Sequence, residues 1–116
     1  MLYNVYNMKT KGLGEFEELV LLAVCILEGE AYGISVKREV EKHSGRSILL
    51  GAVHITLYRL QDKGLLQSEM GGNTAKRGDR RKRLFEVTAA GMKQLHAAQD
   101  VRQKMWQLIP QLKPSL

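Results

Sequence analysis

The chain has little cysteine, few aromatic residues and no long apolar run. Its 116 residues include one cysteine, Cys25, so no intramolecular disulfide can form. Cys25 lies in an apolar run, which favours a small buried side chain over a reactive thiol. Aromatic residues make up 6% of the chain, so aliphatic side chains must fill most of the core. Because no apolar run approaches the ~18 residues that span a bilayer and no signal-peptide pattern is present, we expect a cytoplasmic protein without a membrane partner.

The sequence also lacks the residue patterns of an enzyme or a metal site. Its three histidines, His43, His54 and His96, lie far apart and have no zinc-ligand spacing with the one cysteine. There is no phosphate-binding Gly-Lys motif, no serine elbow and no convincing pair of acids. We therefore expect neither catalysis nor a cofactor.

Positive charge is present, and it is concentrated in one segment. The net charge is +6, from 18 basic and 12 acidic residues. The stretch GGNTAKRGDRRKR, residues 71–83, holds six of the basic residues and one acid, so it carries +5 and the remaining chain only +1. A local excess of this kind points to an anionic partner, whether nucleic acid, an acidic membrane surface or an acidic protein.

The spacing of apolar residues predicts three helices in the first half of the chain. Intervals of three and four residues indicate helices at Glu15–Leu27, Tyr32–His43 and Gly51–Lys63. In the third helix the apolar line is Val53, Leu57 and Leu60, and the other face comprises Ala52, His54, Ile55, Thr56, Tyr58, Arg59, Gln61 and Asp62.

A hairpin of two strands and a last helix follow. Leu65–Glu69 and Lys82–Val87 have the pattern of strands, with the basic segment as the long loop between them. Thr88 is a suitable helix N-cap. The last helix is expected to run to about Ile109, because Pro110 disfavours helix at the residue before it.

This order of elements predicts a mainly α fold with a small two-stranded β wing, the winged helix-turn-helix. In helix-turn-helix modules the later helix of the pair enters the major groove of DNA, and a wing reaches an adjacent groove or the backbone. Lys and Arg in the wing then have a physical role, because each phosphate that they neutralise releases counterions.

Three stretches resemble the PadR family of bacterial transcriptional regulators. AYGISVKREVEK, residues 31–42, is similar to the family's second helix with its Tyr-Gly pair. LGAVHITLYRLQDKGLLQSE, residues 50–69, resembles the recognition helix and first wing strand, and RRKRLFEVTAAGMKQL, residues 80–95, resembles the junction of the wing with the last helix. The resemblance extends from about Gly14 to Trp106. It implies a winged helix, a homodimer held largely by the last helix, and transcriptional control, most often repression.

From this resemblance we expect double-stranded DNA with an inverted-repeat operator as the partner. Short members of the family tend to respond to small hydrophobic compounds or stress signals, so a small hydrophobic effector is a further expectation. The expected organisation is a flexible arm at 1–14, a DNA-binding domain at 15–87, a dimerisation helix at 88–110 and a tail at 111–116.

The recognition helix departs from the family pattern at its start. Members usually have Gly-Thr-Leu-Tyr there, whereas this chain has GAVH, which places His54 where the family has tyrosine. Tyr58 lies one turn later and is a candidate for the phosphate contact. In the second wing strand, Leu84 and Phe85 stand in place of the usual aromatic pair.

Candidate DNA contacts come from three places. They are Lys37 and Arg38 on the second helix, Ala52, His54, Ile55, Tyr58 and Arg59 on the third, and Lys76, Arg77, Arg80, Arg81, Lys82 and Arg83 in the wing. For the helical residues the alternative is a solvated surface or packing on the core, and for Arg59 an ion pair with Asp62 or Glu69. Side chains alternate along a strand, so either Lys82 or Arg83 is expected to face away from DNA.

The last helix has more apolar residues than a lone exposed helix should show. The candidates for a dimer contact are Met92, Leu95, Val101, Met105, Trp106, Leu108 and Ile109. Trp106, the single tryptophan, has two interpretations: packing between the two copies, or an aromatic wall of an effector pocket at the dimer centre.

Two other functions fit the same sequence. A winged domain that binds an acidic protein partner through its basic hairpin would be an adaptor. An RNA-binding accessory protein is a third interpretation, but the wing has few aromatic residues on which bases could stack.

Overall fold

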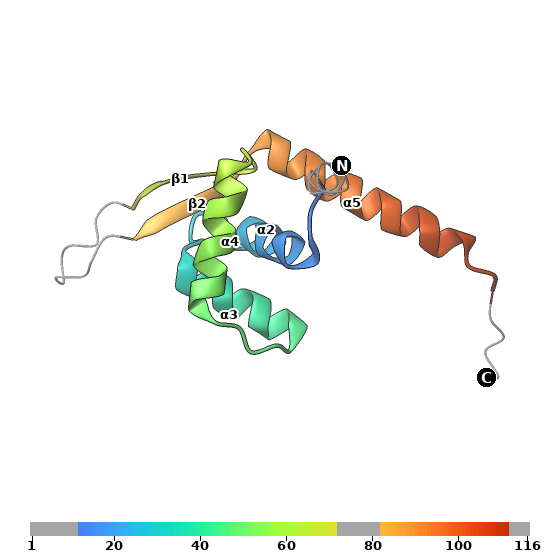
Figure 1. Cartoon of the computed structure of the whole chain (residues 1–116), viewed down its shortest axis with the longest axis horizontal. Helices are drawn as coiled ribbons and strands as arrows, with labels where there is room; N and C mark the ends of the chain where they lie inside the picture. Colours follow the sequence, from blue (N-terminus) through green and yellow to red (C-terminus); the bar gives the residue numbers. More distant parts are fainter. Residues whose placement is uncertain (1–11, 72–81, 112–116) are drawn as a thin grey trace, which may run out of the picture.

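The predicted order of helices and strands is found in the computed structural model, which describes residues 12–71 and 82–111 (Figure 1). Within these residues, six elements follow one another: α2 (Glu15–Leu27), α3 (Gly33–Ser44), α4 (Leu50–Asp62), β1 (Leu66–Met70), β2 (Arg83–Val87) and α5 (Ala89–Leu108). Most of the predicted N-terminal arm, the middle of the basic segment and most of the predicted tail lie outside the described residues.

Element boundaries differ from the predicted ones by about one residue. The first helix has the predicted bounds, whereas α4 begins at Leu50 and β1 ends at Met70, one residue from expectation in each case. Tyr32 is the N-cap of α3, in an extended backbone conformation, and not its first helical residue. Gly45 ends α3 with φ of 73°, a left-handed conformation that glycine adopts without steric cost.

The core lies where α2, α3 and α4 meet. Val53, Leu57 and Leu60, the predicted apolar line of α4, are fully buried together with Leu21 and Val36. Thr56 was predicted on the outer face of α4, and this prediction is wrong, because Thr56 is buried. The reason is its spacing, which is three residues from Val53 and four from Leu60, so Thr56 lies on the same helical face as they do.

The two strands form an antiparallel ribbon that is attached to the helices. Register pairs Leu66 with Val87 and Met70 with Arg83. Halfway along β2, the backbone N–H of Phe85 donates to the carbonyl oxygen of Ala31, at 2.8 Å, in the connection between α2 and α3. Because the Phe85 side chain is also buried in the core, the position of the ribbon relative to the helices is fixed at its middle.

The helix α5 begins in the core and then leaves it. Its N-cap is Thr88 as predicted, whose Oγ1 accepts a hydrogen bond from the Gly91 N–H at 3.0 Å and donates one to the Gly64 carbonyl at 2.8 Å. From residue 99 onward every residue of α5 is exposed. The strands and the free end of α5 accordingly lie at opposite ends of the molecule (Figure 1).

Gly91→Ala should destabilise the fold by about 1–3 kcal/mol, the usual cost of inserting a methyl group into a packed site. A Cβ at this position would lie 2.3 Å from the Leu65 carbonyl oxygen and 2.7 Å from Val87 Cγ1. The matched control is Gly51→Ala, where no atom lies within 4 Å of the added Cβ, and it should stabilise by about 0.5–1 kcal/mol. Urea unfolding at one fixed protein concentration measures both, and equal midpoints for the two variants would contradict this packing.

Candidate nucleic-acid interface

The outer face of α4 carries the five residues predicted to meet DNA. Ala52, His54, Ile55, Tyr58 and Arg59 are all exposed. Ile55 is 60% exposed, although the large apolar residues of the opposite face are fully buried. Within the described residues Arg59 takes part in no ion pair, so the predicted alternative of a bond to Asp62 or Glu69 is not found there.

Two residues of this face also contact other elements. The imidazole of His54 lies directly over Gly33, the first residue of α3, where an added Cβ would be 2.5 Å from its Cε1 atom. Tyr58 is 43% exposed, and its ring meets that of Phe85 edge to face at 5.7 Å between centroids. Tyr58 therefore packs on Phe85 with one part of its ring and leaves another part exposed, and its contact with DNA stays a prediction.

The turn between α3 and α4 is held by Glu41. Its carboxylate accepts a hydrogen bond from the Ile48 N–H at 2.9 Å and one from Lys37 Nζ at 3.3 Å. These two hydrogen bonds keep the pKa of Glu41 below its ordinary value, and the bond from the Ile48 backbone has the larger effect. Lys37 is thus paired within its own helix, whereas Arg38 is exposed.

The basic segment leaves from the end of the ribbon nearest to α3. The backbone N–H of Gly71 donates to the Lys82 carbonyl, so the two residues that flank the 72–81 stretch are neighbours. Lys82 Nζ lies over the Tyr32 ring, 4.1 Å from its centroid, a cation–π contact. Arg83 Nη1 donates to Ser68 Oγ at 3.1 Å. The other four basic candidates, Lys76, Arg77, Arg80 and Arg81, lie outside the described residues.

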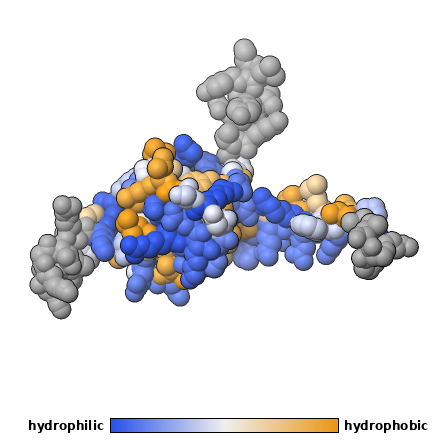
Figure 2. Space-filling view, turned by 90° about the horizontal axis from the view of Figure 1, so that it is seen from below, coloured by the Kyte–Doolittle hydropathy of each residue, from blue (hydrophilic) through white to orange (hydrophobic). Residues whose placement is uncertain are grey.

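Six of the seven apolar candidates on α5 are exposed: Met92, Val101, Met105, Trp106, Leu108 and Ile109. Leu95 was also predicted to meet a second copy, but it is buried in the core of its own protomer. It lies in the first half of α5, where the helix still packs against α2. In Figure 2 apolar side chains are visible on the projecting part of α5, beside hydrophilic ones.

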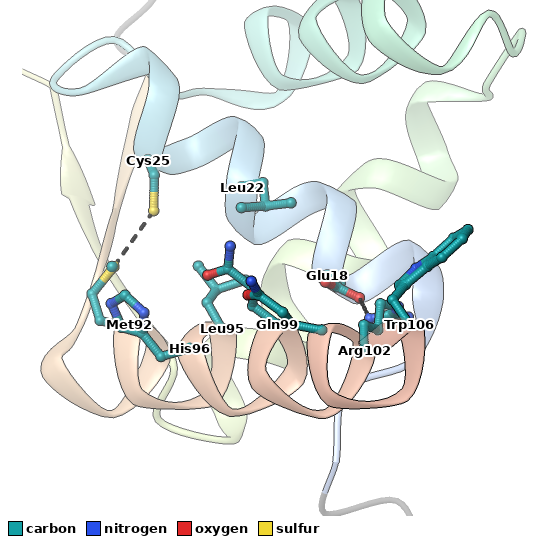
Figure 3. Close-up of a pocket in the computed structure, with 10 residues that line it drawn as sticks. Glu18, Leu22, Cys25, Met92, Leu95, His96, Gln99, Arg102 and Trp106 are labelled. Atoms are coloured by element: carbon teal, nitrogen blue, oxygen red, sulfur yellow. Dashed lines mark hydrogen bonds and ion pairs between the residues drawn. The ribbon is translucent and has the colours of Figure 1, made fainter. Parts of the chain in front are cut away.

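A cavity of about 650 Å³ opens between α2 and α5 (Figure 3). Trp106, 72% exposed, stands at one end of it. At the other end the Cys25 thiol donates to Met92 Sδ at 3.7 Å, and burial raises the pKa of Cys25. Arg102 bonds to Glu18 across the two helices at 2.8 Å. The lining residues are Glu18, Leu22, Cys25, Met92, Leu95, His96, Gln99, Arg102, Gln103 and Trp106.

Sequence reasoning missed several residues that shape this surface. It assigned no role to Gly33 or Tyr32 beyond the Tyr-Gly pair, and it treated Cys25 only as a core residue. Leu49, just before α4, is 79% exposed and was not considered. The sequence does not indicate that Leu49 is exposed. Leu49 is apolar and lies close to the predicted apolar face of α4, and its exposure depends on where the helix begins.

In the ranges 12–71 and 82–111, no helix is both long and apolar enough to cross a bilayer. The same ranges contain no group of three or more His, Cys, Asp or Glu side chains arranged to hold a metal ion.

Comparisons with known proteins agree with this geometry. The family model described as transcriptional regulator PadR-like family matches residues 21–97. Similar solved structures include a PadR family transcription regulator from Clostridium difficile R20291, at 22% identity over 78% of this chain and 92% of that one, with a TM-score of 0.63. A PadR family transcriptional regulator from Eggerthella lenta DSM 2243 is 20% identical over 91% of this chain and 87% of that one, with a TM-score of 0.63.

A third structure contains DNA. Bacillus subtilis PadR in complex with operator DNA is 17% identical over 88% of this chain and 51% of that one, with a TM-score of 0.59. At such identities the likeness to these structures establishes the winged helix-turn-helix fold. No curated protein matches the sequence significantly.

Because His54 contacts Gly33, the effect of Gly33→Ala on stability should depend on whether residue 54 is histidine or alanine, which a double-mutant cycle measures. Gly33 has no positive φ, so Gly33→Ala should stabilise a His54→Ala background by about 0.4–1 kcal/mol by restricting the unfolded chain. In the native chain the added methyl meets the ring, and the substitution should be neutral or destabilising, a coupling of about 0.5–3 kcal/mol. Thermal unfolding measures the cycle. Gly51→Ala, whose added Cβ would have no atom within 4 Å, should have the same effect in both backgrounds, and equal effects of Gly33→Ala would rule out the contact.

Proposed function

The chain belongs to the PadR-like family of DNA-binding transcriptional regulators, and from this premise we propose that it is a homodimeric repressor that binds an inverted-repeat operator and responds to a small hydrophobic molecule. In this proposal α4 is the recognition helix, the basic wing binds the DNA backbone or a neighbouring groove, and α5 joins the two copies. The family is one of regulators and not of enzymes.

One observation carries the proposal: the exposed face of α4 and the start of the basic segment are held together on one body. Lys82, just before β2, contacts Tyr32 before α3, and Phe85 in β2 contacts Tyr58 of α4. A helix placed in the major groove would thus bring the wing to DNA in a fixed relation. The Bacillus subtilis relative was solved with operator DNA, which supports the same assignment here.

The two copies are proposed to join through α5. Val101, Met105, Trp106 and Leu108 in the second half of α5, and Ile109 at its C-cap, are exposed. Each large apolar side chain gains about 1.5–3 kcal/mol on leaving water, so a second copy that covers this surface is strongly favoured. A symmetric dimer would present two α4 helices to successive turns of one duplex, which accounts for an inverted repeat.

The cavity between α2 and α5 is the proposed site of the effector. Its volume of about 650 Å³ lies within the ~300–1,000 Å³ range of small-molecule sites. Leu22, Leu95 and Trp106 supply apolar walls, and Gln99 supplies a polar group. Because α5 is also the proposed dimer contact, a molecule bound there would alter the relation between the two recognition helices.

Selection from random duplexes at near-physiological salt tests the function. We expect enrichment of an inverted repeat whose half-site centres are about 34 Å apart. With Met105→Glu, duplexes with two half-sites at that spacing should no longer be enriched. The dimer loses two methionine contacts, which weakens it by about 3 kcal/mol, or about 100-fold in its dissociation constant. Gln107→Glu, which adds the same charge on a different face of α5, is the control. Failure to enrich any duplex, with salt-sensitive binding of an acidic protein instead, would favour the adaptor.

The wing should contribute affinity without sequence preference. Replacing both Arg80 and Arg81 with alanine is expected to weaken binding to all duplexes alike, and to reduce the slope of log affinity against log salt by up to about 1.8 per chain. The control is the double variant Lys93→Ala and Lys104→Ala, which removes the same charge from α5. Fluorescence anisotropy at several salt concentrations measures the slopes, and identical slopes for both double variants would exclude a wing contact with phosphate.

A further inference from the structure

The exposed face of α4 begins with an apolar line. Leu49 is 79% exposed, Ala52 is exposed, and Ile55 is 60% exposed. Each lies three positions after the one before it, so they follow one another along one side of α4 and of its N-cap, Leu49. The core does not require them, since α4 already presents Val53 and Leu57, both fully buried, on its opposite face.

Hydrogen-bonding side chains are scarce in this part of α4. Between residues 49 and 57 only His54 and Thr56 are polar. Thr56 is buried, and the His54 ring lies against Gly33. Arg59 comes one turn after Ile55, at the other end of the exposed face. The beginning of the helix therefore presents mainly carbon to a partner.

The major groove contains one kind of methyl group that an apolar side chain can contact. All four bases present donors or acceptors there, and thymine alone adds a methyl group, at its C5 atom. An isoleucine placed against a polar base edge would remove water from that edge and supply no hydrogen bond in return. Against a thymine methyl it gains by burying apolar surface on both sides. The N-terminal residues of a recognition helix are those that contact base edges.

We infer that Ile55, with Ala52 beside it, reads the 5-methyl group of a thymine in each half-site of the operator. The inference rests on the proposed DNA-binding function and names the base chemistry that this site selects. Ile55 is the main reader because Ala52 is short and Leu49 lies before the helix. Its β-branched side chain has few rotamers, so little conformational freedom is lost in the contact.

The test removes the methyl group and nothing else. In a duplex obtained by selection, each thymine is replaced in turn by deoxyuridine, which keeps the Watson–Crick edge and the phosphates. We expect one position in each half-site at which affinity falls about fourfold, the effect of one buried methyl group. Replacement at both symmetric positions should lower affinity about 15-fold. The other thymines should tolerate replacement.

Two variants assign the effect to its residue. Ile55→Ala should bind the thymine and uracil duplexes equally, because the side chain that contacts the methyl group is gone. Ile26→Ala is the matched control, since Ile26 is 58% exposed on α2, outside the proposed DNA surface. It should retain the native ratio of the two affinities, whatever its effect on affinity itself.

The outcomes of these experiments distinguish a failure of the thymine inference from a failure of the proposed DNA-binding function. If the selected duplex is bound tightly but no thymine is sensitive to loss of its methyl group, the inference is overturned and DNA recognition stands. If Ile55→Ala keeps the native thymine-to-uracil ratio, another group reads the methyl and the inference is overturned as well. If no duplex is selected at all, both fail together.

Discussion

The burial of one face of α4 is the constraint on which the other features depend. Val53, Leu57 and Leu60 are fully buried against α2 and α3, and each contributes about 1.5–3 kcal/mol by leaving water. Turning the helix by one residue would rotate it by about 100° and expose these side chains. The rotation of α4 is therefore fixed, and with it the identity of the exposed face, which runs from Ala52 through Ile55 to Arg59.

The wing depends on the same core. Phe85 is buried, pairs through its backbone with Ala31, and touches Tyr58 on α4 with its ring. Lys82 is placed over Tyr32 at the start of α3. These contacts join the end of a positively charged segment to a helix whose exposed surface is partly apolar. In the proposed function, phosphate attraction belongs to the wing and base reading to α4, consistent with the division between backbone contacts and base contacts in DNA recognition.

The long helix α5 is joined to the same body and also carries the proposed contact between two copies. Its first half is tied to the body by the Thr88 cap and by Leu95, and the ion pair of Arg102 with Glu18 joins the second half to α2. Its second half carries apolar side chains that the protomer leaves in water. Because the cavity lies along the same helix, between α5 and α2, any change in how α5 sits on α2 would reach both the cavity and the proposed contact between copies.

Local chemistry in the sequence was enough to predict the order of elements, the apolar line of α4 and the Thr88 cap, because each depends on residues a few positions apart. The outer face of α4 followed from that line, apart from Thr56, which lies between two core positions. Contacts between distant residues were decided only by the tertiary structure: His54 over Gly33, Lys82 over Tyr32, and Leu95 in the core instead of at a dimer surface. Periodicity reports which face of an element is apolar, but the atoms that meet that face are set by how separate elements pack.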